Sequence, residues 1–388
     1  MITLLSHIFI KDKDNISDPQ VRQSYGVLCG FLGIFLNLML FTGKFIAGSI
    51  SHSIAITADA FNNLSDAGSS VITLIGFRMA GQRADSDHPF GHGRIEYISG
   101  LLVSIAILIM GFELLKSSLS KIIHPEELSY SPLILGVLIA SILVKCYMAF
   151  YHRSVGKKIN SSSLKATATD SLSDSVATTA VLAATLISHH TGLHLDGWGG
   201  VLVGLFVCYA GYSAARDTIS PLLGQAPDPK FVEQIHRIVL TYEEIIGVHD
   251  LIVHNYGPGR VLISLHAEVP ADGDLMTLHE TIDEIEHRLH DTLHCSAVIH
   301  MDPVLLGDEE TERLRDQVNA YLRQLDPRLS THDFRLVKCS SHTNVFFDIS
   351  APFDLSMSDE ELAKDVKRRL QEADSKYLGV IDIDRELA

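Results

Sequence analysis

Four oxygen-bearing side chains stand at matched spacing in two stretches of this sequence. The stretch "ADAFNNLSDAGSS" carries Asn62 and Asp66, and "ATDSLSDSVAT" carries Asp170 and Asp174. Residues four apart share one face of an α-helix. Three carboxylates brought together repel one another and take up protons, and a divalent cation removes that repulsion. If the two helices pack together, the pattern predicts a site for a divalent cation.

The residue types indicate which cation would bind. The set contains no Cys and no His, and oxygen ligands suit hard cations such as Mn²⁺ or Mg²⁺, whereas Zn²⁺ sites usually include imidazole or thiolate. The alternative is that these residues only hydrogen-bond between helices, which fits one polar residue better than two matched pairs. Asp59, one turn before Asn62, is a candidate for supporting the ligands or carrying protons, or for a packing role.

The surrounding chain is apolar enough for a membrane. Six apolar stretches are long enough to cross a bilayer, which takes roughly 20 helical residues; they lie at 25–47, 54–80, 95–118, 131–152, 167–189 and 197–219. A charge at mid-bilayer costs about 3 kcal/mol even on mild scales, so the second and fifth stretches should lie inside a bundle. Lys44 and Lys145, also embedded, could reach an interface or pair with an acid. Basic residues in alternate loops predict that both termini are cytoplasmic.

The rest of the chain is acidic and has a different pattern. Residues 1–225 hold 15 Lys/Arg and 15 Asp/Glu, and the remainder holds 16 and 32. An acidic domain disfavours nucleic acid as a partner and favours cations. Hydrophobic periodicity predicts the order αββαβ twice. We therefore predict three domains: a membrane domain at 1–220, a cytoplasmic αββαβ domain at 226–305, and a second αββαβ domain at 306–388.

The two αββαβ segments share residues at matching positions, which indicates an internal duplication. The pairs, first segment before second, are His249 and His332, His266 and Asp348, His300 and Asp382, and Asp302 and Asp384. The second set could form a harder, more acidic metal site. The alternative is a cluster of acidic residues on the protein surface.

Five motifs occur in order along the chain: "ADAFNNLSD", "DSDHPFGHGRIE", "TDSLSD", "VHDL" and "VIHMDP". From about residue 20 to 305 the sequence resembles the cation diffusion facilitator family. The resemblance implies a polytopic α-helical membrane protein with six transmembrane helices and a cytoplasmic α+β ferredoxin-like domain. It does not account for residues 306–388, which the matched positions above explain as a duplicate of that domain. It also implies a homodimer that exchanges a divalent metal for protons across the cell membrane, and no enzymatic activity.

The resemblance assigns residues to three metal sites. The transport site maps to Asn62, Asp66, Asp170 and Asp174. A loop site maps to Asp85, His88 and His92, which could instead form a hydrogen-bonded turn. A cytoplasmic site maps to His249, His266, His300 and Asp302, with His279 as a further candidate, although strand histidines can be plain surface residues.

Two features favour the manganese-exporting branch of the family. Zinc-transporting members carry His or Asp at the position of Asn62 and His at that of Asp170. They also often have a His-rich loop after the fourth span, where this chain has "HRSVGKKINSSS". We expect proton-coupled Mn²⁺ efflux, with Zn²⁺ able to bind the cytoplasmic sites. The alternatives are Zn²⁺, Fe²⁺ or Co²⁺ efflux by the same mechanism, or a membrane-anchored metal sensor without transport.

Overall fold

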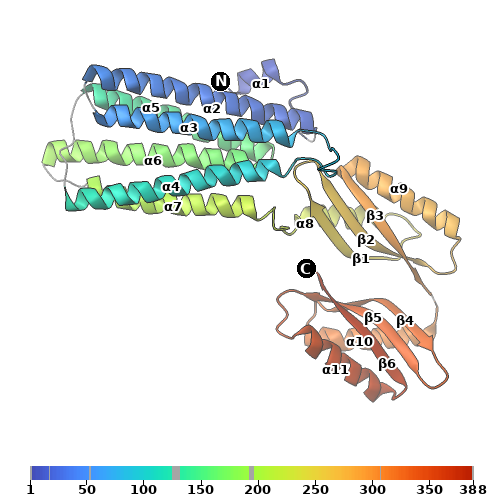
Figure 1. Cartoon of the computed structure of the whole chain (residues 1–388). Coiled ribbons are helices and arrows are strands. Elements are labelled where there is room, and N and C mark those ends of the chain that lie inside the picture. The colour runs from blue at the N-terminus through green and yellow to red at the C-terminus, as the bar shows by residue number, and fades with distance from the viewer. Residues whose placement is uncertain are drawn as a thin grey trace. The chain divides into compact units, whose positions relative to one another are not determined.

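The computed structural model describes residues 2–16, 18–51, 54–124, 132–191, 196–305 and 307–386. The chain forms two compact units (Figure 1). The helical unit comprises residues 1–225 together with Asn255–Arg260, and the α/β unit comprises residues 226–254 and 261–388.

Long helices build the helical unit, and they run roughly along one another (Figure 1). They follow a short first helix, and the full set is α1 (Ile2–Phe9), α2 (Pro19–Ser51), α3 (Ile54–Ala80), α4 (Ile95–Ile123), α5 (Pro132–Lys158), α6 (Ser162–Thr191) and α7 (Asp196–Ile219). The fourth predicted span begins at residue 131, which lies outside the described residues.

Four of these helices, α2, α4, α5 and α7, are long and apolar enough to cross a membrane. Helices α3 and α6, with 27 and 30 residues, are long enough, but they do not reach the same hydropathy in the described part of the chain. Six membrane spans therefore stay a prediction, with length and composition supporting four of them.

Helix α3 buries its polar side chains on one face. Its buried polar residues recur every three or four positions, which places them on one side of the helix. They are Asn63, Asp66, Ser70 and Thr73, with Ser69 also buried beside Ser70. The opposite side presents large apolar residues to the outside, namely Phe61, Leu64, Val71 and Ile75. Helix α6 likewise buries a polar face, which carries Thr167, Asp170, Ser171 and Ser175. Both helices thus turn polar side chains inward, as the sequence predicted for the second and fifth stretches.

The helices pack in pairs, with α2 along α3, α5 along α6 and α4 along α7. Small residues permit the closest of these approaches. At Gly204 on α7, an added Cβ would lie 2.7 Å from the side chain of Leu115 on α4. The α4–α7 pair therefore depends on the absence of a side chain at this position.

The α/β unit contains two modules with the same order of elements. The first module comprises α8 (Pro229–Val239), β1 (Gly247–Asn255), β2 (Val261–Pro270), α9 (Leu275–Leu293) and β3 (Cys295–Val304). Its strands form one sheet in the order β1-β2-β3, with β2 and β3 parallel. Asp228 and Asp274 begin the two helices, since each side chain accepts a hydrogen bond from a backbone N–H of the first turn.

The second module comprises α10 (Glu309–Leu325), β4 (Ser330–Lys338), β5 (Thr343–Pro352), α11 (Asp359–Ala373) and β6 (Tyr377–Glu386). Its sheet has the order β4-β5-β6, with β4 and β5 antiparallel and β5 and β6 parallel. Ser358 and Glu361 form a capping box at the start of α11. Each module buries its own apolar core. The predicted element order αββαβ is present in both, and their origin by duplication stays a hypothesis.

Candidate metal centres

Asp66 on α3 and Asp170 and Asp174 on α6 lie together inside the helical unit. One carboxylate oxygen of each lies within 4.8 Å of the others. Asp66 and Asp170 are buried, and Asp174 is half-buried. A hydrogen bond of 2.9 Å between the hydroxyls of Thr73 and Thr167 joins the same two helices. The structure thus brings together three of the four residues that the matched spacing selected.

A lysine pairs with two of these carboxylates. The Nζ atom of Lys145 on α5 lies 2.7 Å from Asp66 Oδ2 and 2.7 Å from Asp174 Oδ2. A second buried lysine, Lys44 on α2, has its Nζ 2.8 Å from Asp59 Oδ2. The sequence left open whether the two lysines reach an interface or pair with acids, and the structure pairs both. The contacts of Lys145 partly neutralise the cluster, and Lys44 pairs with Asp59 outside it. Both pairs avoid the cost of an unpaired buried charge.

A cavity of about 290 Å³ opens beside the carboxylates, and Asp66, Asp174 and Lys145 are among the residues that line it. Asn62 also lines the cavity, with an exposed side chain. Its neighbour Asn63 lines the same cavity but is buried. Its Nδ2 donates to the carbonyl of Asp59 (2.9 Å), while its Oδ1 has no hydrogen bond within the described residues. Sequence reasoning did not select Asn63, although the Asn-Asn doublet offered the signal.

The loop after α3 holds the second predicted set. Asp85, His88 and His92 each place one potential ligand atom within 4.8 Å of the others. Asp85 Oδ2 lies 3.5 Å from His92 Nε2, and Oδ1 lies 3.6 Å from His88 Nδ1. Asp85 Oδ1 also accepts the backbone N–H of His88 (2.7 Å), and this bond lowers the pKa of the carboxyl. The capped turn and the cluster of ligand atoms are therefore both present.

Three residues of the first module form the third predicted set. His249 on β1, His266 on β2 and Asp302 on β3 present ligand atoms within 4.8 Å of one another. Asp302 Oδ2 is shared, at 2.9 Å from His266 Nδ1 and 3.3 Å from His249 Nε2. The parallel pairing of β2 with β3 brings these strands side by side. The sheet thus assembles residues that are 53 positions apart in the sequence.

Two other candidates of the first module lie outside this group of three. His300 stands opposite His266 in the strand pairing, and its Nε2 lies 3.2 Å from Asp302 Oδ1. Its side chain is 66% exposed, compared with 15% for Asp302. His279 on α9 is exposed and pairs with Asp283 on the same helix. His300 is therefore a peripheral neighbour of the cluster, and His279 is not grouped with it.

The second module assembles the corresponding residues. His332 on β4, Asp348 on β5 and Asp384 on β6 place ligand atoms within 4.8 Å of one another. His332 Nε2 lies 3.4 Å from Asp384 Oδ2. Asp382 stands opposite Asp348 in the strand pairing but is exposed and is not in the group. Three of the four residues expected here therefore lie together.

Burial and neighbouring charge act on the acid–base behaviour of these clusters. Burial lowers the pKa of His249, but the adjacent carboxylates of Asp250 and Asp302 raise it by more, so that the net shift is upward. Contact with His249 lowers the pKa of Asp250. Burial raises the pKa of Asp348. A cation that binds His249 must therefore compete with a proton.

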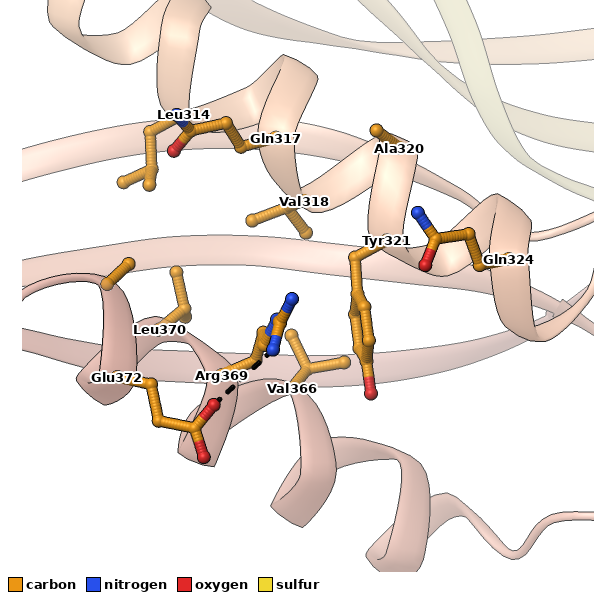
Figure 2. Close-up of a pocket in the computed structure, with 11 residues that line it drawn as sticks. Leu314, Gln317, Val318, Ala320, Tyr321, Gln324, Val366, Arg369, Leu370 and Glu372 are labelled. Carbon is orange, nitrogen blue, oxygen red and sulfur yellow. Dashed lines mark hydrogen bonds and ion pairs between the residues drawn. The ribbon is translucent and has the colours of Figure 1, made fainter.

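The second module also has a hollow between α10 and α11 that is larger than the cavity beside the carboxylates. Its volume is about 460 Å³, and apolar residues such as Leu314, Val318 and Leu370 line it together with Tyr321 (Figure 2). Among the described residues that line it, Glu372 is the one carboxylate, and this lining offers no set of ligands for a cation.

Comparison with known proteins relates these clusters to a family. Residues 30–223 match the cation efflux transmembrane domain, and residues 227–304 match the cytoplasmic domain of cation efflux proteins. The two matches cover well over half of the chain. This chain belongs to the cation efflux family. Members of the family are membrane proteins that export divalent metal cations and are not enzymes.

Several curated relatives align with most of their own length. An uncharacterised transporter of Methanocaldococcus jannaschii is 32% identical over 274 residues, which are 70% of this chain and 96% of that protein. The manganese efflux system protein MneS of Bacillus subtilis is 27% identical and is covered to 92%, with 69% of this chain aligned. A cadmium, cobalt and zinc/H⁺-K⁺ antiporter of Bacillus velezensis is 26% identical and is covered to 94%, with 73% of this chain aligned.

The matched ranges contain some of the candidate metal centres of this cation efflux protein and not others. The carboxylate cluster, the loop cluster and the cluster of the first module lie inside the matched ranges. The cluster around His332 lies beyond residue 304, after the matched cytoplasmic domain. The relatives' names include manganese and also cadmium, cobalt and zinc, so family membership does not single out one metal.

Proposed function

We propose that this cation efflux protein exports Mn²⁺ from the cytoplasm in exchange for protons. The observation that carries the proposal is the composition of the cluster in the helical unit. Asp66, Asp170 and Asp174 supply carboxylate oxygens, Asn62 and Asn63 line the adjoining cavity, and among the described residues no His or Cys lines that cavity. Oxygen-only ligation suits a hard cation.

The contacts of Lys145 support an exchange mechanism. Its ammonium pairs with Asp66 and Asp174, the carboxylates that an incoming cation would need. The cation would displace the ammonium and any protons on the carboxylates, and protons arriving from the other side would release the cation. Lys145 would then return to its partners. In this scheme the lysine replaces part of the positive charge that protons would otherwise supply.

Efflux of Zn²⁺, Fe²⁺ or Co²⁺ by the same mechanism is the second candidate, and the zinc, cadmium and cobalt antiporter among the relatives supports it. Affinity alone favours Zn²⁺ over Mn²⁺ at most sites. We propose that the absence of imidazole weakens Zn²⁺ binding enough to favour Mn²⁺. A selectivity change of tenfold needs only about 1.4 kcal/mol.

Ion flux into proteoliposomes tests the proposal. We expect Mn²⁺ flux driven by a proton gradient in the wild type, and a shift of the Mn²⁺/Zn²⁺ ratio toward Zn²⁺ in Asn62→His. Leu64→His is the matched control, because it adds the same imidazole on α3 at an exposed position that is not among the residues lining the cavity. Binding of metal without flux would instead identify a membrane-anchored sensor. An unchanged ratio in Asn62→His would contradict the selectivity argument.

We further propose that the loop cluster of Asp85, His88 and His92 and the first-module cluster of His249, His266 and Asp302 bind divalent metal, with His300 at its edge. Two observations support these roles. The Nδ1 atom of His92 is buried without a hydrogen bond in the described part of the chain. Mixed imidazole and carboxylate ligands also suit Zn²⁺. We propose a homodimer in the cell membrane, with six spans and cytoplasmic termini.

A further inference from the structure

Two buried histidines from different modules face each other in the α/β unit. The rings of His249 on β1 and His332 on β4 are 4.2 Å apart between centroids. Their side chains are 6% and 7% exposed. None of their four ring nitrogens makes a hydrogen bond within the described residues. Buried polar groups without hydrogen bonds are rare in folded proteins. Carboxylates lie 3.3 to 3.9 Å from three of these nitrogens, so a bound cation would satisfy both the imidazoles and the carboxylates.

The two histidines occupy equivalent positions in their modules. Each is followed by an aspartate in the left-handed region, with φ of 54° at Asp250 and 50° at Asp333. Left-handed backbone is uncommon for residues other than glycine, so the two strands share an unusual local conformation. Equivalent residues that face each other are expected where two copies of a fold pack about an approximate twofold axis.

The rest of each cluster follows the same equivalence. The grouped residues stand at matching strand positions, and in both modules the fourth predicted residue is the one left outside. The grouped pairs are His249 and His332, His266 and Asp348, and Asp302 and Asp384, and the excluded pair is His300 and Asp382. The modules therefore bring two equivalent sets of ligands together.

Asp250 connects the two sets. Its Oδ2 lies 3.3 Å from His249 Nδ1 in the first module, and its Oδ1 lies 3.9 Å from His332 Nε2 in the second. One ligand atom from each of these three residues falls within 4.8 Å of the others. Its equivalent in the second module, Asp333, instead lies 3.7 Å from the guanidinium of Arg335. The two oxygens of the Asp250 carboxylate thus face histidines of different modules.

We propose that the second module supplies His332 as a ligand to a divalent cation that His249 and Asp250 of the first module also bind, so that one metal centre joins the two modules. This inference extends the metal-binding role proposed above for the first-module cluster. It adds a function for residues beyond the matched family domains, since the second module completes a site that the first module begins.

The separations between ligand atoms fit a metal better than they fit hydrogen bonds. Two ligands of a tetrahedral Zn²⁺ ion lie about 3.3 Å apart. In the proposed centre, Asp250 Oδ2 lies 3.3 Å from His249 Nδ1, and Asp250 Oδ1 lies 3.9 Å from His332 Nε2, which is beyond hydrogen-bond reach. The mixture of imidazole and carboxylate suits a borderline cation such as Zn²⁺ or Co²⁺ more than Mg²⁺. The preferred metal of this centre should therefore differ from that of the oxygen-only cluster.

Metal binding to the full-length protein in detergent tests the proposal. Bound Zn²⁺ per chain is measured by equilibrium dialysis for His332→Gln, Asp250→Asn and the double variant. The matched controls are His342→Gln, which removes the other histidine of the second module, and Asp333→Asn, which changes the equivalent left-handed aspartate. The carboxylate cluster and the loop cluster stay intact in all variants, and Asp250→Asn also leaves the set of His332, Asp348 and Asp384 intact. The assay does not depend on flux, so its outcome is separate from that of the transport proposal.

We expect His332→Gln and Asp250→Asn each to weaken Zn²⁺ binding at one class of site by at least about tenfold. The loss of Zn²⁺ binding free energy in the double variant should be smaller than the sum of the losses in the two single variants, because both residues bind at one centre. Thermal melting in the presence of chelator should change little in His332→Gln, while the stabilisation by added Zn²⁺ should shrink. Wild-type binding in both single variants, or strictly additive losses, would overturn the proposal.

Discussion

Lys145 offers the sharpest test of the mechanism in the helical unit. The substitution Lys145→Gln removes the ammonium from between Asp66 and Asp174 while keeping a polar side chain of similar length. The buried cluster then holds three carboxylates without this internal cation. Like charges in one site force protonation, so the variant should bind an additional proton at neutral pH.

The two contacts of 2.7 Å set the size of the effect. Hydrogen bonds to charged groups contribute about 1.5–3 kcal/mol each, so an incoming cation must overcome about 3–6 kcal/mol to displace the lysine. In Lys145→Gln, protonation of the carboxylates offsets part of the gain in metal affinity that follows from removing the lysine. We therefore expect metal affinity at alkaline pH to rise at least about tenfold, which corresponds to about 1.4 kcal/mol. About one more proton should be released per metal ion bound.

Calorimetric titration with Mn²⁺ in buffers of different ionisation enthalpy measures both quantities. Lys116→Gln is the control, because Lys116 is exposed on α4 and does not line the cavity. The control should keep the affinity and proton count of the wild type. An unchanged proton count and affinity in Lys145→Gln would refute the idea that this lysine competes with the transported cation.

Two further predictions concern stability. Gly204→Val should lower the melting temperature of the helical unit, because its Cβ would lie 2.7 Å from the Leu115 side chain. Overpacking of this kind costs about 1–3 kcal/mol of folding free energy. Gly199→Ala should be tolerated, because no atom lies within 4 Å of its added Cβ. Ser358→Ala should destabilise the start of α11 by about 1 kcal/mol through loss of the capping box. Faster hydrogen exchange in the first turn of α11 would reveal this loss, and exchange equal to that of an exposed-site control, Ser356→Ala, would contradict it.

Local periodicity predicted the elements and part of the site. A spacing of four placed Asp170 and Asp174 on one face of α6, and alternation in the strands identified αββαβ in both modules. Periodicity does not reveal partners that come from distant segments. Lys145 is 79 positions from Asp66, and whether a buried lysine pairs or reaches an interface depends on how α5 packs.

Prediction from the sequence is limited in a similar way in the α/β unit. Alternation places His300 and Asp302 on the same face of β3, but it does not indicate which of them the neighbouring strands cover. The structure covers Asp302 and leaves His300 exposed. The approach of His332 to Asp250 depends on packing between modules, for which no short sequence pattern exists. The sequence comparison that paired His249 with His332 nevertheless identified the two residues that face each other.

The reversed polarity of α3 and α6 has a consequence for biogenesis. Each has apolar residues on its outer side and polar residues on its inner side, so that either helix alone in lipid would expose its polar side chains to the acyl chains. Helix α2 lies along α3, and α5 lies along α6, which suits insertion of the chain as helical hairpins rather than as single segments. The carboxylates would stay uncovered until the two hairpins meet, so that assembly of the bundle and formation of the cation cage become the same event.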